Sequence, residues 1–110
     1  LRFNLQLFFE DEGFNCFPFE SAELALKALE NSCFDAAIVD LRLPGINGEE
    51  FIIRASEICS HMKCILYTGS SDFKLTDELK KINFVKEDIF LKPITDMSIL
   101  LNRINEKMKL

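Results

Sequence analysis

The spacing of apolar residues along the chain changes repeatedly between a helical and an extended pattern. Near the beginning, apolar residues including Leu5 and Phe9 fall on one helical face, and Gly13 follows as a stop signal. The same spacing returns four more times, and Ser21 is suited to cap the second of the five segments. Helices are therefore predicted at about residues 1–12, 21–31, 48–60, 72–82 and from Thr95 or Asp96 onward.

Short apolar runs separate these helices and have the length of strands. Two runs are nearly continuous, which is typical of strands covered on both faces: "FDAAIVD" (34–40) and "CILYTGS" (64–70). A third run, "DIFLKP" (88–93), predicts a last short strand. A weaker run, "FNCFPF" (14–19), alternates apolar and polar residues, and its Pro18 favours an edge strand. Strict alternation of helices and strands predicts an α/β fold with a parallel sheet and helices on both faces.

Three chemically different side chains stand at the carboxyl ends of the predicted strands. Asp40 closes the first continuous run, Thr68 lies at the end of the second, and Lys92 lies at the end of the third. In a parallel sheet of this kind, ligands bind outside the carboxyl ends of the strands. Taken singly, these residues are ordinary turn formers or surface groups. Together they predict a site that combines a carboxylate, a hydroxyl and an ammonium.

A tight turn follows the strand that ends at Asp40. Pro44, Gly45 and Gly48 are predicted to return the chain into the next helix without crowding the carboxylate. Gly69 follows the second strand, where it either keeps the approach to the site open or simply permits a turn. The two interpretations of Gly69 are equally supported.

Composition limits the classes of function. The 110 residues fit one domain, and 13 basic against 18 acidic side chains give a net charge of −5. That sign disfavours binding to a nucleic-acid backbone or an anionic membrane. No apolar run approaches the roughly 20 residues of a membrane span, and the first residues do not have the layout of a signal peptide. We therefore expect a cytoplasmic protein that binds neither nucleic acid nor membrane.

The four cysteines do not have the spacing of a metal site. They form no C-x-x-C pair, and His61 is the single histidine of the chain. Four reduced thiols in or near the core are the favoured interpretation, because free cysteine behaves as a small hydrophobic residue. The even number of cysteines leaves disulfide bonding open as the alternative.

Three blocks of the sequence resemble the signature blocks of the response-regulator receiver domain, as in chemotaxis regulators. They are "IVDLRLPGINGEEF" (38–51), "CILYTGS" (64–70) and "IFLKPI" (89–94), in the family's order. The resemblance covers residues 1–110 and implies a flavodoxin-like fold with five parallel strands in the order 2-1-3-4-5. The family's first strand, which ends in an acidic pair, is not found in the sequence. We therefore interpret residues 1–110 as an N-terminally incomplete receiver domain.

The resemblance assigns roles to the residues at the strand ends. It implies that Asp40 is the phosphoacceptor, Thr68 the switch hydroxyl and Lys92 the group that contacts the phosphoryl oxygens. Pro93 matches a proline whose preceding peptide bond is typically cis. Asp40 and the backbone carbonyl of Arg42 fall where the family binds a metal ion.

Charge explains why this chemistry needs a cation. A carboxylate that faces a dianionic phosphoryl group at ~4 Å meets about 8 kcal/mol of repulsion at an effective dielectric constant of about 20. One lysine offsets part of this repulsion, and a divalent cation is required for most of the rest. Mg²⁺ suits oxygen ligands, but we expect it only if the upstream acidic pair exists.

The expected function is that of a switch in two-component phosphorelay signalling rather than that of an enzyme. The phosphoryl donor would be a histidine kinase or a phosphotransfer protein, and homodimerisation through the last strand and the last helix is possible by analogy.

Two alternatives remain open from the sequence. A phosphorylation-independent, receiver-like interaction domain is favoured by the absent acidic strand and by Ile89, which stands where the family usually has Tyr or Phe. A phosphohydrolase usually has a second acid two residues after the nucleophile, but Arg42 occupies that position.

Overall fold

Three parallel strands form the centre of the molecule. The structure is a computed structural model that describes residues 2–42 and 45–109, so that Pro44 of the predicted turn lies outside the described residues. The strands pair in the order β1-β2-β3. The elements are α1 (Arg2–Asp11), α2 (Ala22–Leu29), β1 (Ala36–Val39), α3 (Gly48–Ile58), β2 (Lys63–Thr68), α4 (Asp77–Lys81), the 3-10 helix η1 (Lys86–Asp88), β3 (Ile89–Leu91) and α5 (Ser98–Met108).

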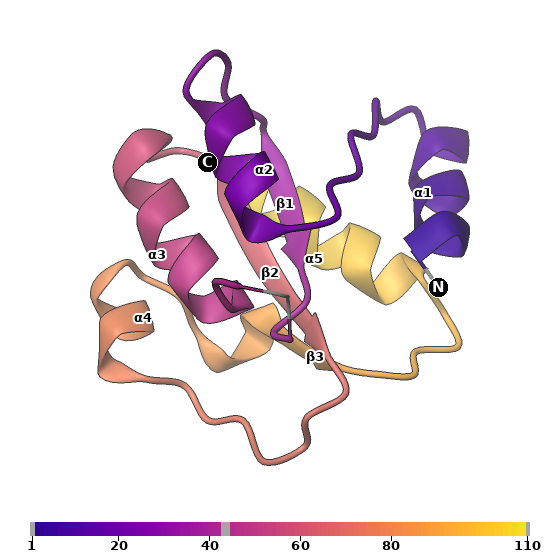
Figure 1. Ribbon diagram of the computed structural model, residues 1–110. Coiled ribbons are helices and arrows are strands. Elements are labelled where there is room, and N and C mark those ends of the chain that lie inside the picture. Colours follow the sequence, from indigo (N-terminus) through magenta and orange to yellow (C-terminus); the bar gives the residue numbers. More distant parts are fainter. Residues whose placement is uncertain (1, 43–44, 110) are drawn as a thin grey trace.

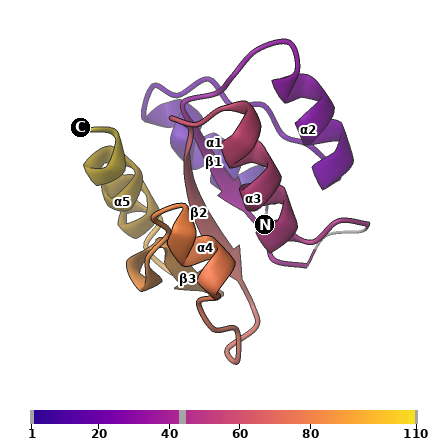
Figure 2. The same ribbon diagram turned by 90° about the vertical axis from the view of Figure 1, so that its left-hand side faces the viewer.

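Helices cover both faces of the sheet, as the sequence predicted (Figures 1 and 2). Side chains alternate along the middle strand β2. Cys64 and Leu66 belong to the core cluster formed with α2, α3 and α4. Ile65 and Tyr67 belong to a second cluster formed with α1 and α5. The middle strand is therefore buried on both faces, which explains its nearly continuous apolar sequence.

The helix boundaries follow local capping. Gly13 has φ +95° just beyond α1, and the Ser21 hydroxyl accepts a hydrogen bond from the Leu24 N–H, as the sequence indicated. The predicted helix at 72–82 is wrong in its first part, because α4 begins only at Asp77. The Thr76 hydroxyl accepts a hydrogen bond from the Leu79 N–H at 3.3 Å, and this cap fixes the later start.

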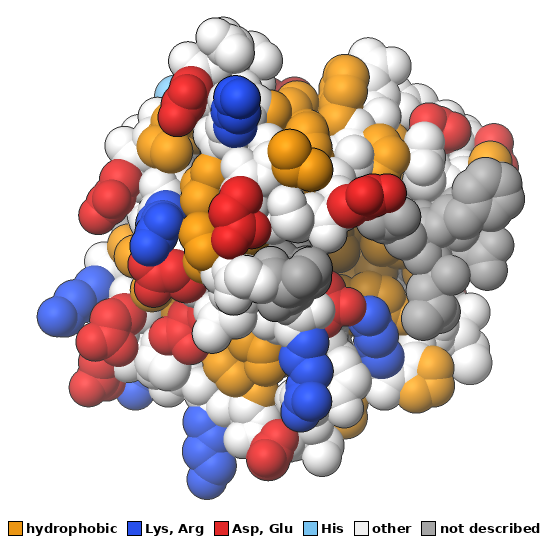
Figure 3. All heavy atoms as spheres, viewed as in Figure 1, with side chains coloured by type: hydrophobic (Ala, Val, Ile, Leu, Met, Phe, Trp, Pro, Cys, Tyr) orange, Lys and Arg blue, Asp and Glu red, His pale blue; other side chains and the backbone are white. Residues whose placement is uncertain are grey.

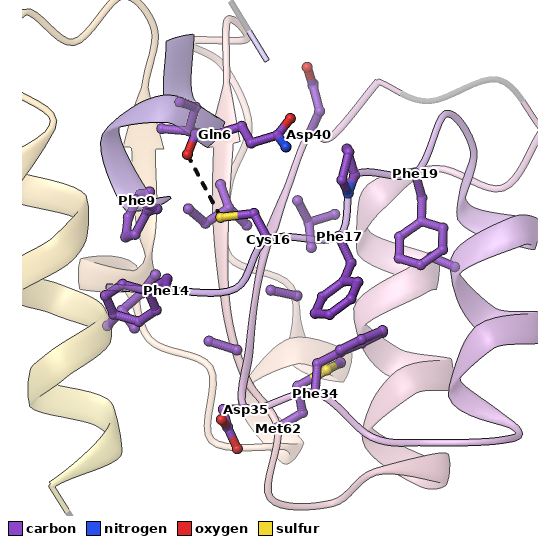
Figure 4. Close-up of a pocket in the computed structure, with 18 of the residues that line it drawn as sticks. Gln6, Phe9, Phe14, Cys16, Phe17, Phe19, Phe34, Asp35, Asp40 and Met62 are labelled. Atoms are coloured by element: carbon purple, nitrogen blue, oxygen red, sulfur yellow. Dashed lines mark hydrogen bonds between the residues drawn. The ribbon is translucent and has the colours of Figure 1, made fainter. Parts of the chain in front are cut away.

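The edge strand predicted at residues 14–19 is not formed. A groove of about 1050 Å³ separates this segment from β1, so the segment has no strand within pairing distance. The hollow is lined by hydrophobic side chains (Figure 3), and Figure 4 shows Phe14, Cys16 and Phe17 along it. The segment is held instead by side chains: the Phe17 and Phe34 rings lie 5.3 Å apart, and the Cys16 thiol donates to the Gln6 carbonyl oxygen at 3.8 Å.

One edge of β1 faces this groove. The Lys63 N–H donates to the Asp35 carbonyl oxygen, so the backbone groups of alternate residues from Asp35 point toward β2. The backbone groups of Ala36 and Ile38 therefore point away from β2, and no strand within residues 2–42 and 45–109 pairs with them. This is the edge at which the receiver resemblance places the family's first strand.

The expectation of four reduced cysteines is wrong for two of them. Cys33 and Cys59 form a disulfide, because packing of α2 against α3 brings together two residues 26 positions apart. Cys16 and Cys64 are free, and burial raises the pKa of the Cys64 thiol to about 12. Disulfides are typical of oxidising compartments, so the cytoplasmic location stays a prediction. None of the described helices is long and apolar enough to cross a membrane.

A buried ion cluster fastens α5 to the segment before β3. Asp88 is fully buried, and its Oδ1 lies 2.8 Å from both Arg103 Nε and Lys107 Nζ. Its other oxygen accepts a hydrogen bond from the Val85 N–H at 3.0 Å. Lys107 also lies over the Phe84 ring, 5.5 Å from the centroid. Every oxygen of this buried carboxylate therefore has a partner, which such a group requires.

The cluster gives a stability prediction. Asp88→Asn keeps the shape of the side chain but removes the buried counter-charge that Arg103 and Lys107 share, so the free energy of unfolding should fall by about 3–5 kcal/mol. Urea unfolding followed by circular dichroism measures this change. The matched control is Asp77→Asn, because Asp77 is 87% exposed and lies 3.9 Å from Lys80. That substitution should change stability by less than about 0.5 kcal/mol. Equal effects of the two substitutions would show that the buried cluster does not fasten α5.

Candidate functional site

The fold brings the three predicted site residues to one edge of the sheet. Asp40 follows β1 directly, Thr68 ends β2, and Lys92 follows β3 directly. The strands are held in register, with Thr68 opposite Leu91, and the Lys92 N–H continues the ladder by donating to the Thr68 carbonyl oxygen at 2.7 Å. The parallel register therefore places the carboxylate, the hydroxyl and the ammonium at neighbouring strand ends.

Asp40 and Lys92 form an ion pair across the end of the sheet. Lys92 Nζ lies 2.7 Å from Asp40 Oδ2, and Asp40 Oδ1 accepts a hydrogen bond from the Arg42 N–H at 3.1 Å. The Asp40 side chain is 38% exposed and the Lys92 side chain 24%. The carboxylate is therefore held in place from two sides while it remains open to a reactant from solvent.

The Thr68 hydroxyl is turned toward its own loop. Thr68 is fully buried, and its Oγ1 accepts a hydrogen bond from the Ser70 N–H at 3.1 Å. Within the described part of the chain, this hydroxyl forms no hydrogen bond with Asp40. Its proton is still available for a further bond, because a hydroxyl can donate and accept at once.

Arg42 links the two loops that border the site. Its Nε donates to the Ser70 hydroxyl oxygen at 3.0 Å, so the loop after β1 is tied to the loop after β2. The two side chains that bond to Ser70, those of Arg42 and Thr68, therefore both belong to predicted site residues. Sequence reasoning missed this link, since the partners are 28 positions apart and neither sits in a local pattern.

Gly48 allows the chain to fold back close to Asp40. A Cβ atom at Gly48 would overlap the Asp40 carbonyl oxygen and lie 2.9 Å from the carbonyl carbon. The turn is closed by the Gly48 N–H, which donates to the Leu41 carbonyl oxygen at 2.8 Å. Gly45 has φ +76°, a conformation that favours glycine. The sequence also gave no sign that Glu23 of α2 accepts a hydrogen bond from the Ile46 N–H in this turn.

The residues around Lys92 fix the other side of the site. The Lys92–Pro93 peptide bond is cis. Lys92 Nζ lies 5.1 Å from the centroid of the Tyr67 ring, and the Tyr67 hydroxyl accepts a hydrogen bond from the Ile94 N–H at 3.4 Å. Ile89 is half-buried. It packs against the core cluster formed with α2, α3 and α4, on the face of the sheet opposite to Tyr67. Sequence reasoning did not single out Tyr67, which looked like one more apolar residue of a buried strand.

The described residues supply part of a metal site only. Asp40 contributes one carboxylate, and Arg42 would contribute a backbone carbonyl. No group of three or more His, Cys, Asp or Glu side chains suited to a metal ion occurs among residues 2–42 and 45–109. The oxygen donors present are of the kind that Mg²⁺ prefers, but they do not complete its ligand set. The expectation of Mg²⁺ therefore remains conditional on further acidic ligands.

Comparison with known sequences identifies related proteins. Residues 1–105 match the family model of the response regulator receiver domain. The transcriptional regulatory protein FixJ of Bradyrhizobium diazoefficiens is 30% identical over 96 residues, which are 87% of this chain and 46% of FixJ. The virulence sensor protein BvgS of Bordetella bronchiseptica is 32% identical over 92 residues, 79% of this chain and 7% of BvgS. The chain thus spans less than half the length of these relatives.

Comparison with solved structures gives the same picture. A CheY-like receiver domain protein from Methanospirillum hungatei JF-1 superposes with a TM-score of 0.81 at 26% identity, covering 96% of this chain and 82% of that one. The response regulator TrrA from Thermotoga maritima, solved in complex with Mg²⁺ and BeF, gives a TM-score of 0.80 at 23% identity, with coverages of 96% and 88%.

Gly48 gives a prediction about the support of the site. Gly48→Ala should lower the free energy of unfolding by about 1–3 kcal/mol, because the overlap is with backbone rather than with a movable side chain. Chemical denaturation measures this net loss, in which the steric cost outweighs the helix-propensity gain of about 1 kcal/mol. Gly69→Ala is the control, since a Cβ there meets no atom within 4 Å. If Gly48→Ala is as stable as Gly69→Ala, the close approach does not constrain the turn.

Proposed function

Because the chain belongs to the response regulator receiver domain family, we propose that Asp40 accepts a phosphoryl group from a histidine kinase or a phosphotransfer protein and that the domain then changes its contacts with partners. The resemblance in the three sequence blocks and the flavodoxin-like fold class are confirmed. The role of Asp40 rests chiefly on one observation, the 2.7 Å contact between Lys92 Nζ and Asp40 Oδ2 at the carboxyl edge of the sheet.

The proposed reaction forms an acyl phosphate. A carboxylate oxygen of Asp40 attacks the phosphorus atom of a phosphohistidine, so that an O–P bond forms and the N–P bond breaks. The imidazole nitrogen leaves with the electron pair of the broken bond and takes up a proton. The partial exposure of the Asp40 side chain supports this role, because an in-line approach from solvent requires an open carboxylate.

Lys92 has two successive tasks in this proposal. Before transfer it holds the Asp40 carboxylate, and after transfer the same ammonium contacts a phosphoryl oxygen. This contact offsets part of the repulsion between the carboxylate and the incoming group. Mg²⁺, when bound to Asp40, the Arg42 carbonyl and further acidic ligands, would supply the remaining positive charge.

Thr68 and the loop after β2 are the proposed route by which transfer changes the surface. A phosphoryl group on Asp40 offers acceptor oxygens, to which the Thr68 hydroxyl can donate its proton. The oxygen of this hydroxyl already accepts from Ser70, and Ser70 is bonded in turn to Arg42. A shift of Thr68 therefore moves two neighbouring loops together.

The surface beside β3 and α5 is the proposed site of partner contact. Leu91 and Ile99 are large apolar side chains that are each about half exposed, 50% and 47% respectively. A homodimer through the last strand and the last helix would cover them. The alternative function, a receiver-like interaction domain that does not need phosphorylation, would use the same surface without a change at Asp40.

The test is phosphorylation of the full chain by acetyl phosphate with Mg²⁺, followed by intact-mass measurement. We expect the added mass of one phosphoryl group, which should not form when a chelator is present during the reaction and should be absent from Asp40→Asn. Asp35→Asn is the matched control, because Asp35 is an exposed acid at the opposite end of β1 and should leave the adduct unchanged.

Two results would contradict the proposal. A folded protein that binds Mg²⁺ at Asp40 but acquires no phosphoryl mass would favour the phosphorylation-independent alternative. An adduct that persists in Asp40→Asn would place the phosphoryl group on another residue.

A further inference from the structure

We propose that Tyr67 is a positioning residue whose ring holds the Lys92 ammonium against the Asp40 carboxylate. Lys92 Nζ lies 5.1 Å from the centroid of the Tyr67 ring and 2.7 Å from Asp40 Oδ2. A cation over an aromatic face is attracted by the negative face of the ring. The ammonium is thus held from two directions by groups on two different strands.

Tyr67 is itself firmly fixed. It is only 6% exposed and belongs to the core cluster formed by α1, α5 and one face of β2. Its hydroxyl accepts a hydrogen bond from the Ile94 N–H, two residues after Lys92. The ring therefore contacts the lysine head group and, through its hydroxyl, the backbone that carries the lysine.

The flexible stem of lysine explains why a fixed aromatic support matters; we call the Tyr67 ring under the Lys92 ammonium the Tyr67 platform. The side chain has a flexible four-carbon stem and loses rotamer freedom when its head group is held in one place. The Lys92 side chain is still 24% exposed, so packing alone does not immobilise it. The rigid ring restricts the positions of the ammonium to those near Asp40.

Tyr67 is distinct from the aromatic position at which this chain has Ile89. Ile89 packs on the face of the sheet covered by α2, α3 and α4, whereas Tyr67 packs on the face covered by α1 and α5. A ring that is buried and hydrogen-bonded serves as a fixed support rather than as a rotating group. The site of this chain thus has its aromatic residue under the lysine.

The contact can be tested without any phosphoryl transfer. In NMR spectra of the ¹³C,¹⁵N-labelled full chain, Lys92 side-chain protons near the ring should be shifted upfield by the ring current, and its NH₃⁺ signal should be observable because the carboxylate slows proton exchange. Tyr67→Phe, which keeps the ring, should retain both signatures. Tyr67→Leu should lose both. Lys107, whose ammonium lies over the Phe84 ring, is the internal control, and its NMR signals should be unchanged in both variants.

A kinetic measurement then tests the effect on the proposed function, on which this part rests. With acetyl phosphate and Mg²⁺, the Tyr67→Leu variant should become phosphorylated about two- to tenfold more slowly than the wild type. The Tyr67→Phe variant should become phosphorylated at a rate within about twofold of the wild-type rate. Urea unfolding of both variants verifies that each remains folded.

The outcomes separate this inference from the proposed function. Absence of the upfield shift in the wild type, or its persistence in Tyr67→Leu, would overturn the platform. Loss of the shift with retention of the Lys92 NH₃⁺ signal would show that the ring does not position the ammonium. An unchanged phosphorylation rate would overturn its relevance to transfer. If the wild type acquires no phosphoryl group, the proposed function fails, while the two NMR signatures still decide whether Tyr67 positions Lys92.

Discussion

The contact between Lys92 and Asp40 joins the ends of the two outer strands across the end of the middle one. It exists only because three strands of different lengths stop at the same edge in parallel register. The Gly48 turn lets the chain leave Asp40 without displacing it, and two residues beyond Lys92 the Ile94 N–H donates to the hydroxyl of Tyr67. The fold around the site thus serves mainly to keep two opposite charges in contact and accessible.

The pair lies at the carboxyl edge of the sheet, next to residues that pack on both of its faces. On one face, Thr68, Ser70 and Arg42 connect the strand ends to the loops that lead into α3 and α4. On the other face, Tyr67 connects the lysine to the core shared by α1 and α5. In the proposed function, a phosphoryl group on Asp40 would bind both the Lys92 ammonium and the Thr68 hydroxyl, so side chains on both faces of the sheet would respond to it.

Much of this arrangement could be predicted from the sequence. Short apolar runs predicted the three strands, and the rule that ligands bind outside the carboxyl ends of parallel strands predicted that Asp40, Thr68 and Lys92 lie together. The predictions failed where a local pattern depends on a distant partner. Residues 14–19 have strand-like composition but no neighbouring strand. The predicted helix does not form before Asp77, because the Thr76 side chain caps it at that point. The Arg42–Ser70 bond, the Tyr67 platform and the Asp88 cluster join residues that no spacing rule relates.

The disulfide between Cys33 and Cys59 places part of the site inside a covalently closed ring and leaves the rest outside it. It closes a covalent ring that contains β1, Asp40 and all of α3, while Thr68 and Lys92 lie outside it. Closing a ring of this size removes unfolded-state entropy worth about 3.5 kcal/mol in the loop-closure treatment. Reduction of the disulfide would therefore lower the free energy of unfolding of the whole domain, because the constraint acts on the unfolded chain. The contact between Asp40 and Lys92 joins a residue inside this ring to one outside it, so both sides of the site depend on the redox conditions around the protein.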